Sequence, residues 1–333
     1  MDQRQPPLVA VLGASGFIGS AVVRELAGRA VRLRTVARRR VVLPRAAVAE
    51  HEHLTADLTE AGAMASAVAD ADAVIYLVAH ITGPSGWRAA EDDPEAVRVN
   101  LAPLRSLTDA LRDAPRHGPP PVVVFAGTTM QAGLAATTRI DGSEPDRPET
   151  PYPRQKLAAE RLLKQADADG VLHGISLRLP TVYGHVPGSA AGDLGVVSVM
   201  VRRALSGQGL TMWNDGAVRR DLVHVEDVAR AFVGSLDHAT GLRGRHWVVG
   251  SGLSVSLREL FGGISTAVAA HTGGEAVPVD SVPPPQYAER GDFHSVEVDA
   301  SKFRRITGWR PRVALTEGLT RTVASLNGQR AAG

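Results

Sequence analysis

The feature that most constrains the fold is a regular alternation of apolar runs with helical patterns through the first 180 residues. The apolar runs have the length and composition of buried strands: LVAVLG (8–13), VRLRTVAR (31–38), DADAVIYLVAH (70–80), PVVVFAG (121–127) and GISLRLP (174–180). Patterns typical of helices lie between them: AVVRELAGR (21–29), residues 94 to 113, and LAAERLLKQA (157–166). This alternation predicts an α/β fold with a doubly wound parallel sheet, covered on both faces by helices.

The sequence changes character after Pro180. Gly-rich and Pro-rich segments separate shorter patterned stretches: HVPGSAAGDLG (185–195), a helix over 196–205, a turn at NDG (214–216), a strand and helix over 222–237, and VDSVPPPQYAERGDFHS (279–295). We therefore expect a large domain of residues 1–180, which residues 220–250 rejoin. A smaller, discontinuous lid domain would comprise residues 181–219 and 251–330.

Composition excludes several classes of function. The chain has no Cys, which rules out disulfides, thiolate metal sites and cysteine nucleophiles, and we assign no metal-ligating residues. A net charge of +2 gives no reason to expect binding to nucleic acid or to an acidic membrane. No apolar run is long enough to span a bilayer, and the start MDQRQPP lacks the pattern of a signal peptide. A cytoplasmic location is the resulting expectation.

The stretch LGASGFIGS (12–20) joins the first predicted strand to the first predicted helix. Its glycines, Gly13, Gly16 and Gly19, recur every three residues. Glycines in this setting let backbone N–H groups approach a pyrophosphate at a helix N-terminus, as in a Rossmann-type dinucleotide fold. A tight strand-to-helix connection without a ligand is the alternative. The strand before the turn and the helix after it favour the phosphate site.

The end of the second predicted strand indicates which dinucleotide binds. An acidic residue there suits a free ribose 2′-hydroxyl, whereas Arg suits a 2′-phosphate. The strand ends in TVARRR (35–40), with Arg38, Arg39 and Arg40 and no carboxylate. This predicts NADPH, against the alternative of a solvated basic turn in an Arg-rich chain. Asp57, in TADL, can reach the adenine edge or be an exposed loop residue.

Two segments supply candidate reacting groups. YPRQK places Tyr152 and Lys156 four residues apart, on one face of a helix. A nearby ammonium is expected to lower the pKa of the Tyr152 hydroxyl and so allow proton exchange near neutral pH. Thr128 and Thr129 follow the strand PVVVFAG, at the sheet edge where parallel sheets bind ligands. A hydroxyl there can bond a substrate oxygen or cap a helix, and for Thr129 we favour the cap.

Taken together, GASGFIG, FAGTT and YPRQK resemble the extended short-chain dehydrogenase/reductase family, also called the NAD-dependent epimerase/dehydratase family. RLPTVYG (178–184), DGAVRRDLVHVEDVA (215–229) and ERGDF…VDASKFRRITGWRP (289–311) follow in the family's order, so the resemblance covers nearly the whole chain. The family includes UDP-galactose 4-epimerase and the TDP-glucose 4,6-dehydratases. Its TDP-4-keto-6-deoxyhexose 4-ketoreductases are the most similar group.

The resemblance implies roles for individual residues. Thr128 would be the catalytic hydroxyl, Tyr152 the acid/base, and Lys156 the group that binds the nicotinamide ribose and tunes Tyr152. Further cofactor contacts are implied at Ser15, Phe17, Ile18, Leu58, Leu77, Ala79 and Asn100. Implied substrate contacts are His80, Trp87, Thr129, Thr181, Arg220 and Arg290. Ion pairs to Asp221 or Asp292 are an alternative for the two Arg, and packing within its own loop is one for Trp87.

Departures from the family narrow the expected reaction. The dehydratases carry Asp-Glu after the catalytic Thr, where this chain has Thr129 and Met130. The epimerases usually have an acidic residue at the second strand, and Thr181 replaces the family's Asn near the diphosphate. The resemblance therefore implies NADPH-dependent reduction of a keto group on a nucleotide-linked sugar, as in reduction of the C4 ketone of a TDP-4-keto-6-deoxyhexose. A sugar-nucleotide epimerase, a reductase of another carbonyl compound and a non-catalytic NADP(H)-binding protein are the alternatives. The resemblance also implies a homodimer that pairs through the Tyr152 helix and residues 94–113. The alternative is that the apolar residues of these segments face the chain's own sheet.

Overall fold

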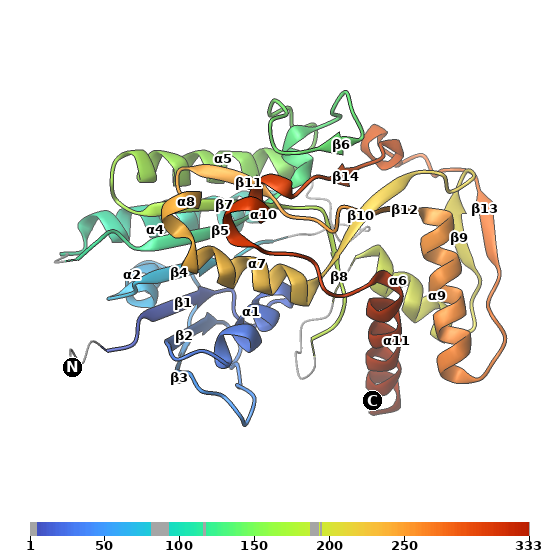
Figure 1. Cartoon of the computed structure of the whole chain (residues 1–333), viewed down its shortest axis with the longest axis horizontal. Coiled ribbons are helices and arrows are strands. Elements are labelled where there is room, and N and C mark those ends of the chain that lie inside the picture. Colours follow the sequence, from blue (N-terminus) through green and yellow to red (C-terminus); the bar gives the residue numbers. More distant parts are fainter. Residues whose placement is uncertain (1–4, 81–92, 116–117, 187–192, 194, 333) are drawn as a thin grey trace.

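A seven-stranded sheet forms the centre of the computed structural model, which describes residues 5–80, 93–115, 118–186, 193 and 195–332 (Figure 1). The strand order is β11-β7-β5-β4-β1-β2-β3, and every neighbouring pair is parallel. The strands are β1 (Leu8–Leu12), β2 (Arg32–Ala37), β3 (Glu50–Thr55), β4 (Ala73–Tyr76), β5 (Val122–Thr128), β7 (His173–Leu179) and β11 (Arg245–Val248). The order reverses between β1 and β4, where such sheets bind ligands at the carboxyl edge. The predicted fold class is confirmed.

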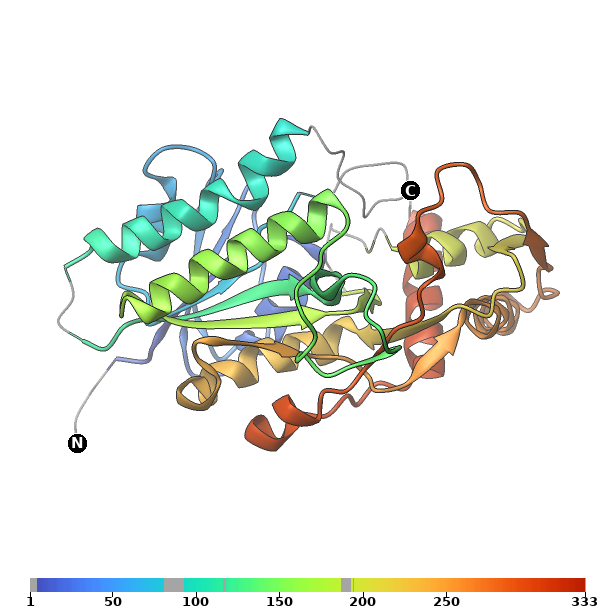
Figure 2. The ribbon, with the colours of Figure 1, turned by 90° about the horizontal axis from the view of Figure 1, so that it is seen from above.

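Helices cover both faces of this sheet (Figure 2). On one face, α1 (Phe17–Ala27) and α7 (Val225–Asp237) pack into one apolar cluster with the strands. On the other face, α2 (Ala63–Val68), α4 (Ala102–Asp113) and α5 (Pro151–Ala168) complete a second cluster. Because both faces are covered, a central strand such as β1 is buried at every residue, which explains its uninterrupted apolar sequence.

The single helix predicted over residues 94 to 113 is two helices. α3 (Pro94–Asn100) ends at Leu101, whose backbone lies outside the helical region, and α4 begins at Ala102. Pro103 follows at once and has no N–H to continue a helical hydrogen-bond ladder, but it is tolerated in the first turn of a new helix. The prediction was wrong because apolar periodicity alone does not register this break.

The C-terminal part has its own core, which lies beyond the end of the large sheet in Figure 1. This core is built from α6 (Val196–Leu205), α9 (Leu257–Thr272), α11 (Leu315–Ala332) and the parallel pair of β9 (Leu210–Trp213) and β13 (Val279–Val282). β11, from the predicted 220–250 segment, pairs with β7 in the large sheet. The division into two domains at the predicted residues stays a prediction.

Small elements connect the two parts. β10 (Arg219–His224) lies between β8 (Thr181–Tyr183) and β12 (Ser254–Ser256). The remaining short elements are η1 (Thr129–Ala132), β6 (Arg139–Ile140), α8 (Ala239–Leu242), η2 (Arg290–Phe293), β14 (Glu297–Val298) and α10 (Ser301–Thr307). β14 pairs with β6, so the segment between β5 and α5 contacts a strand from the C-terminal region.

Candidate active site

The three glycines at the junction of β1 and α1 have different roles. Gly13 has φ +84°, and a Cβ there would lie 3.1 Å from the backbone carbonyl carbon of Leu77. Gly16 caps α1, whose N-terminus receives no side-chain hydrogen bond from the cap. A Cβ on Gly19 would lie 2.1 Å from the carbonyl oxygen of Gly13. The backbone therefore forms a close cradle beside an open helix N-terminus, which fits a dinucleotide pyrophosphate. Ser15 lies in the same turn, and Phe17 and Ile18 are the first two residues of α1.

The basic residues after β2 are exposed. Within the described part of the chain, Arg38, Arg39 and Arg40 have no ion-pair partner. The nearby Asp57 accepts hydrogen bonds from the Thr59 hydroxyl at 2.7 Å and the Thr59 N–H at 2.9 Å. These bonds, with a smaller contribution from the charge of Arg38, lower the pKa of the Asp57 carboxyl. Arg38 thus lies near Asp57, while the adjoining Leu58 is buried in the core.

Tyr152 and Lys156 lie together in the first two turns of α5. The Lys156 Nζ is 5.8 Å from the centre of the Tyr152 ring and 4.9 Å from the centre of the Phe125 ring. Burial lowers the pKa of Lys156 to about 8. Burial also raises the pKa of the Tyr152 hydroxyl, which is opposite to the predicted lowering. The prediction was wrong because removing a phenolate from water outweighs the nearby ammonium here.

Thr128 ends β5 and caps the short helix η1. Its Oγ1 accepts a hydrogen bond from the Met130 N–H at 3.3 Å, which leaves the hydroxyl hydrogen available to another acceptor. We expected Thr129 to be the cap, and this was wrong. Thr128 has the extended backbone that an N-cap requires, whereas Thr129 is the first residue of η1. Both side chains are buried.

Asn100 connects the segment after β4 to α5. Its Oδ1 accepts the His80 N–H at 2.7 Å, and its Nδ2 donates to the His80 carbonyl at 3.0 Å and to Gln155 Oε1 at 2.7 Å. The side chain is buried. These bonds hold the backbone at His80, which follows Leu77 and Ala79, close to Gln155, the residue that precedes Lys156 in α5. The His80 ring also lies 3.7 Å from the Asp93 carboxylate.

The predicted substrate residues in the C-terminal part come from two strands and one short helix. Arg220, in β10, donates to the backbone carbonyls of His294, Asp292 (2.7 Å) and Gly291 (3.3 Å). Carbonyls at the end of a short helix lack internal partners, so a guanidinium satisfies them well. Among the described residues, Arg220 therefore bonds these carbonyls rather than forming a close ion pair with Asp221 or Asp292, although the charge of Asp292 acts on it.

The remaining predicted substrate residues differ in their surroundings. Arg290, in η2, is exposed and has no ion-pair partner within the described residues. Thr181, in β8, lies opposite Leu222 of β10. Trp87 lies outside the residues that the structure describes.

The sequence motifs did not predict an aromatic cluster that lies next to Arg290. The Trp213 ring centre lies 6.2 Å from that of Tyr287 and 6.3 Å from that of Phe293. Tyr287 is 62% exposed and Phe293 40% exposed. Exposed aromatic rings that are grouped together suit stacking with a planar group. The signal was present in the sequence, because a chain with 4% aromatic residues places three of them in TMWND and PPPQYAERGDF.

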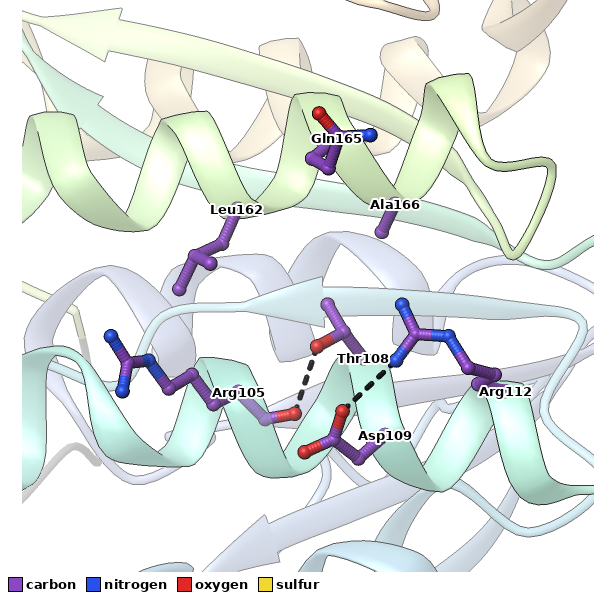
Figure 3. A pocket seen from close by; sticks show the side chains of 7 residues that line it. All are labelled: Arg105, Thr108, Asp109, Arg112, Leu162, Gln165 and Ala166. Atoms are coloured by element: carbon purple, nitrogen blue, oxygen red, sulfur yellow. Dashed lines mark hydrogen bonds and ion pairs between the residues drawn. The ribbon is translucent and has the colours of Figure 1, made fainter.

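A hollow of about 260 Å³ lies between α4 and α5 (Figure 3). Its lining comes from both helices: Arg105, Thr108, Asp109, Arg112, Leu162, Gln165 and Ala166. Tyr152 and Lys156 lie in the first turns of α5, whereas this hollow follows its C-terminal half. We therefore do not assign it to the active site. The homodimer expected through these helices stays a prediction.

The described residues contain neither a membrane-spanning helix nor a metal-binding cluster. No helix there combines the length and apolar character needed to cross a membrane. Over the same residues, no group of three or more His, Asp or Glu is placed to hold a metal ion.

Comparison with known proteins gave consistent results. Residues 9–250 match the NAD dependent epimerase/dehydratase family. The chain is 29% identical to the UDP-glucose 4-epimerase of Mycolicibacterium smegmatis, over 94% of this chain and 96% of that protein. It is 28% identical to the dTDP-L-rhamnose 4-epimerase of Burkholderia thailandensis, over 93% of this chain and 92% of that protein. The structure of the Thermus thermophilus UDP-glucose 4-epimerase complex with NAD is similar, with a TM-score of 0.77, 27% identity and coverage of 96% of this chain and 99% of that chain.

Proposed function

The chain belongs to the NAD dependent epimerase/dehydratase family, and we propose that it is an NADPH-dependent reductase of the C4 ketone of a TDP-linked 4-keto-6-deoxyhexose. The observation that carries the proposal is the combination of an intact Tyr152–Lys156 pair with the exposed Arg38–Arg40 at the end of β2. The acid/base pair supports turnover. The Arg side chains support a cofactor that carries a 2′-phosphate and is exchanged after each reaction.

The residues present fit this cofactor. Gly13, Gly16 and Gly19 leave room for a pyrophosphate at the N-terminus of α1. Arg38, with Arg39 beside it, would hold the 2′-phosphate with charge-assisted hydrogen bonds. Asp57 and Leu58 follow β3, the strand next to β2, and we assign them to the adenine side. Asn100 would act indirectly, because its side-chain amide already fixes the backbone at His80.

NADPH, when bound, supplies the hydride for C4 of the sugar. Tyr152 then donates its proton to the oxygen that develops negative charge, and burial keeps that proton on the hydroxyl at neutral pH. The Thr128 hydroxyl hydrogen is free to bond the same oxygen, because Oγ1 uses a lone pair for the Met130 N–H. Lys156 holds positive charge beside Tyr152 and stabilises the phenolate that remains.

The substrate would lie between the catalytic edge and the C-terminal part. Arg290 is proposed to contact the diphosphate, together with Arg220, which also fixes the backbone of the η2 segment. Trp213, Tyr287 and Phe293 provide rings for the nucleotide base. Thr129 and Met130 offer no carboxylate for removing a sugar hydroxyl, which argues against dehydration.

An assay of net cofactor oxidation tests this function. The purified protein is mixed with TDP-4-keto-6-deoxyglucose and either NADPH or NADH, and the absorbance of the reduced nicotinamide is followed. We expect rapid loss with NADPH, much slower loss with NADH, and no turnover by Tyr152→Phe. Full turnover by Tyr152→Phe would refute the proposed acid/base role.

A 4-epimerase is the second candidate, because similar proteins carry that name. An epimerase uses its cofactor catalytically, so it would convert one TDP- or UDP-hexose into its C4 epimer without consuming added NADPH. Tightly bound NAD that survives purification would favour this candidate.

A further inference from the structure

A buried hydrogen-bond chain joins the backbone of Thr128 to α5. The Gln131 Oε1 accepts the Thr128 N–H at 2.9 Å, and its Nε2 donates to Glu160 Oε2 at 3.0 Å. Gln131 and Glu160 are both fully buried. The Gln131 side chain therefore links the Thr128 N–H at one end to a carboxylate of α5 at the other end.

The carboxylate at the far end is held from several sides. Oε2 of Glu160 also accepts from the Ser176 hydroxyl at 2.8 Å and from Arg178 Nε at 3.0 Å, while Oε1 accepts from Arg178 at 2.7 Å and from Lys164 Nζ at 2.7 Å. Burial opposes ionisation of Glu160, but hydrogen bonds from His246 and Arg178, with the charges of Arg178 and Lys164, lower the pKa of its carboxyl far below the usual range. Glu160 is a fixed, ionised acceptor.

The chain of bonds begins on the helix face that carries the catalytic pair. Tyr152, Lys156 and Glu160 follow one another at intervals of four residues, so they project from one side of α5. The same helix face positions Tyr152 directly and reaches Thr128 through Gln131. Gly127 makes room for this link, because a Cβ there would lie 2.8 Å from Gln131 Oε1.

We propose that Gln131 is a positioning residue, which with Glu160 sets the Thr128 hydroxyl at its working distance from Tyr152. The effect on catalysis that we infer for Gln131 rests on the proposed function. Without the Gln131 amide, the Thr128 N–H loses its acceptor, and pairing with β7 alone holds the end of β5. A displacement near 1 Å in such a group costs about 100-fold in rate.

Gln131→Met is the first test, because it keeps the approximate length of the side chain and removes both hydrogen bonds. We expect kcat for ketone reduction to fall about 100-fold while KM for the sugar nucleotide stays close to wild type. Ser176→Ala is the matched control. It removes one donor from the same buried carboxylate but makes no hydrogen bond to Gln131 or Thr128, so its kcat should stay close to that of the wild type.

A double-mutant cycle separates positioning from a general structural effect. Thr128→Val removes the hydroxyl and should cost on the order of 100-fold in kcat. If Gln131 acts through that hydroxyl, adding Gln131→Met to Thr128→Val should cost little more. Multiplied effects of the two substitutions would overturn the inference, even if the wild type reduces the ketone as proposed.

Hydrogen exchange at the Thr128 amide gives a readout that is independent of activity. Exchange should accelerate in Gln131→Met and remain slow in Ser176→Ala. If the wild type reduces no sugar nucleotide but exchange still accelerates in Gln131→Met, the proposed function is refuted and the positioning of Thr128 is retained. Unchanged exchange in Gln131→Met would overturn the positioning itself.

Discussion

At the scale of single residues, burial shifts the pKa values of Tyr152 and Lys156 in opposite directions. The Tyr152 hydroxyl has a raised pKa, so it keeps a proton to donate, whereas Lys156 has a pKa lowered to about 8. The spacing in YPRQK predicted that the two side chains lie together. It did not predict the direction of the Tyr152 shift, because burial depends on packing between elements that are remote in sequence, as in the contact of Lys156 with Phe125.

This arrangement predicts a pH dependence of the free enzyme. Burial disfavours the ammonium, so Lys156 loses its charge as the pH rises through about 8 instead of about 10. We expect kcat/KM for NADPH to be level below pH 8 and to fall about tenfold per pH unit above it. Steady-state kinetics over this range measure the effect. A profile that stays level to pH 10 would contradict the role of the charged Lys156.

Arg38 predicts the cofactor preference. Arg38→Ala removes the proposed contact with the 2′-phosphate, which is worth about 10- to 100-fold for a charge-assisted bond. KM for NADPH should rise by that factor, while KM for NADH should not change. Arg45→Ala removes another exposed Arg from the segment that follows β2 and serves as the control. Equal effects on the two cofactors, or equal effects of the two substitutions, would argue against this assignment.

Among secondary-structure elements, the buried ones were predicted from the sequence more accurately than the exposed ones. The helix over 196–205 has the bounds of α6, and the apolar runs coincide with the central strands. β3 was missed because EHEHLT is an exposed edge strand without an apolar face. Pro103 is a sequence signal for the break at Leu101, which apolar periodicity alone does not use. The bonds from Arg220 to η2 were not predictable, since their partners lie some 70 residues away.

The turn before α1 permits a sharp comparison of two glycines. Gly19→Ala would place a Cβ 2.1 Å from the Gly13 carbonyl oxygen and force the turn and helix apart. Gly28→Ala, at the other end of α1, meets nothing closer than 3.9 Å. We expect Gly19→Ala to abolish cofactor binding measured by calorimetry and Gly28→Ala to preserve it. Wild-type affinity in Gly19→Ala would show that the cofactor does not use this turn.

For the whole molecule, a buried carboxylate joins segments that are remote in the chain. Asp221 accepts the N–H groups of Ser251 (2.7 Å), Gly252 (2.9 Å) and Val298 (3.1 Å), and is 1% exposed. It therefore fastens β10 to β14 and to the segment before β12. The sequence predicts that residues 220–250 belong to the large domain and residues 251–330 to the lid, but it gives no means to identify this connection between them.

Replacement of Asp221 should weaken the whole fold. Asp221→Asn turns an acceptor into a donor that faces backbone N–H groups, and we expect a loss of about 3 kcal/mol in the free energy of unfolding. Urea denaturation measures it. Asp237→Asn is the control, because Asp237 pairs with Arg29 at the surface and its loss should cost no more than about 0.5 kcal/mol. Equal stability of the two variants would contradict this role of Asp221.

The central claim is that hydride passes from NADPH to C4 of the sugar with net reduction. The most direct measurement supplies NADPH deuterated at C4 of the nicotinamide, on each face in turn, together with TDP-4-keto-6-deoxyglucose. We predict that one of the two labels appears at C4 of a reduced sugar product, in an amount equal to the NADPH consumed. If this ketone takes up no label and consumes no NADPH, while the protein interconverts a TDP- or UDP-hexose and its C4 epimer, the claim is contradicted and an epimerase is favoured instead.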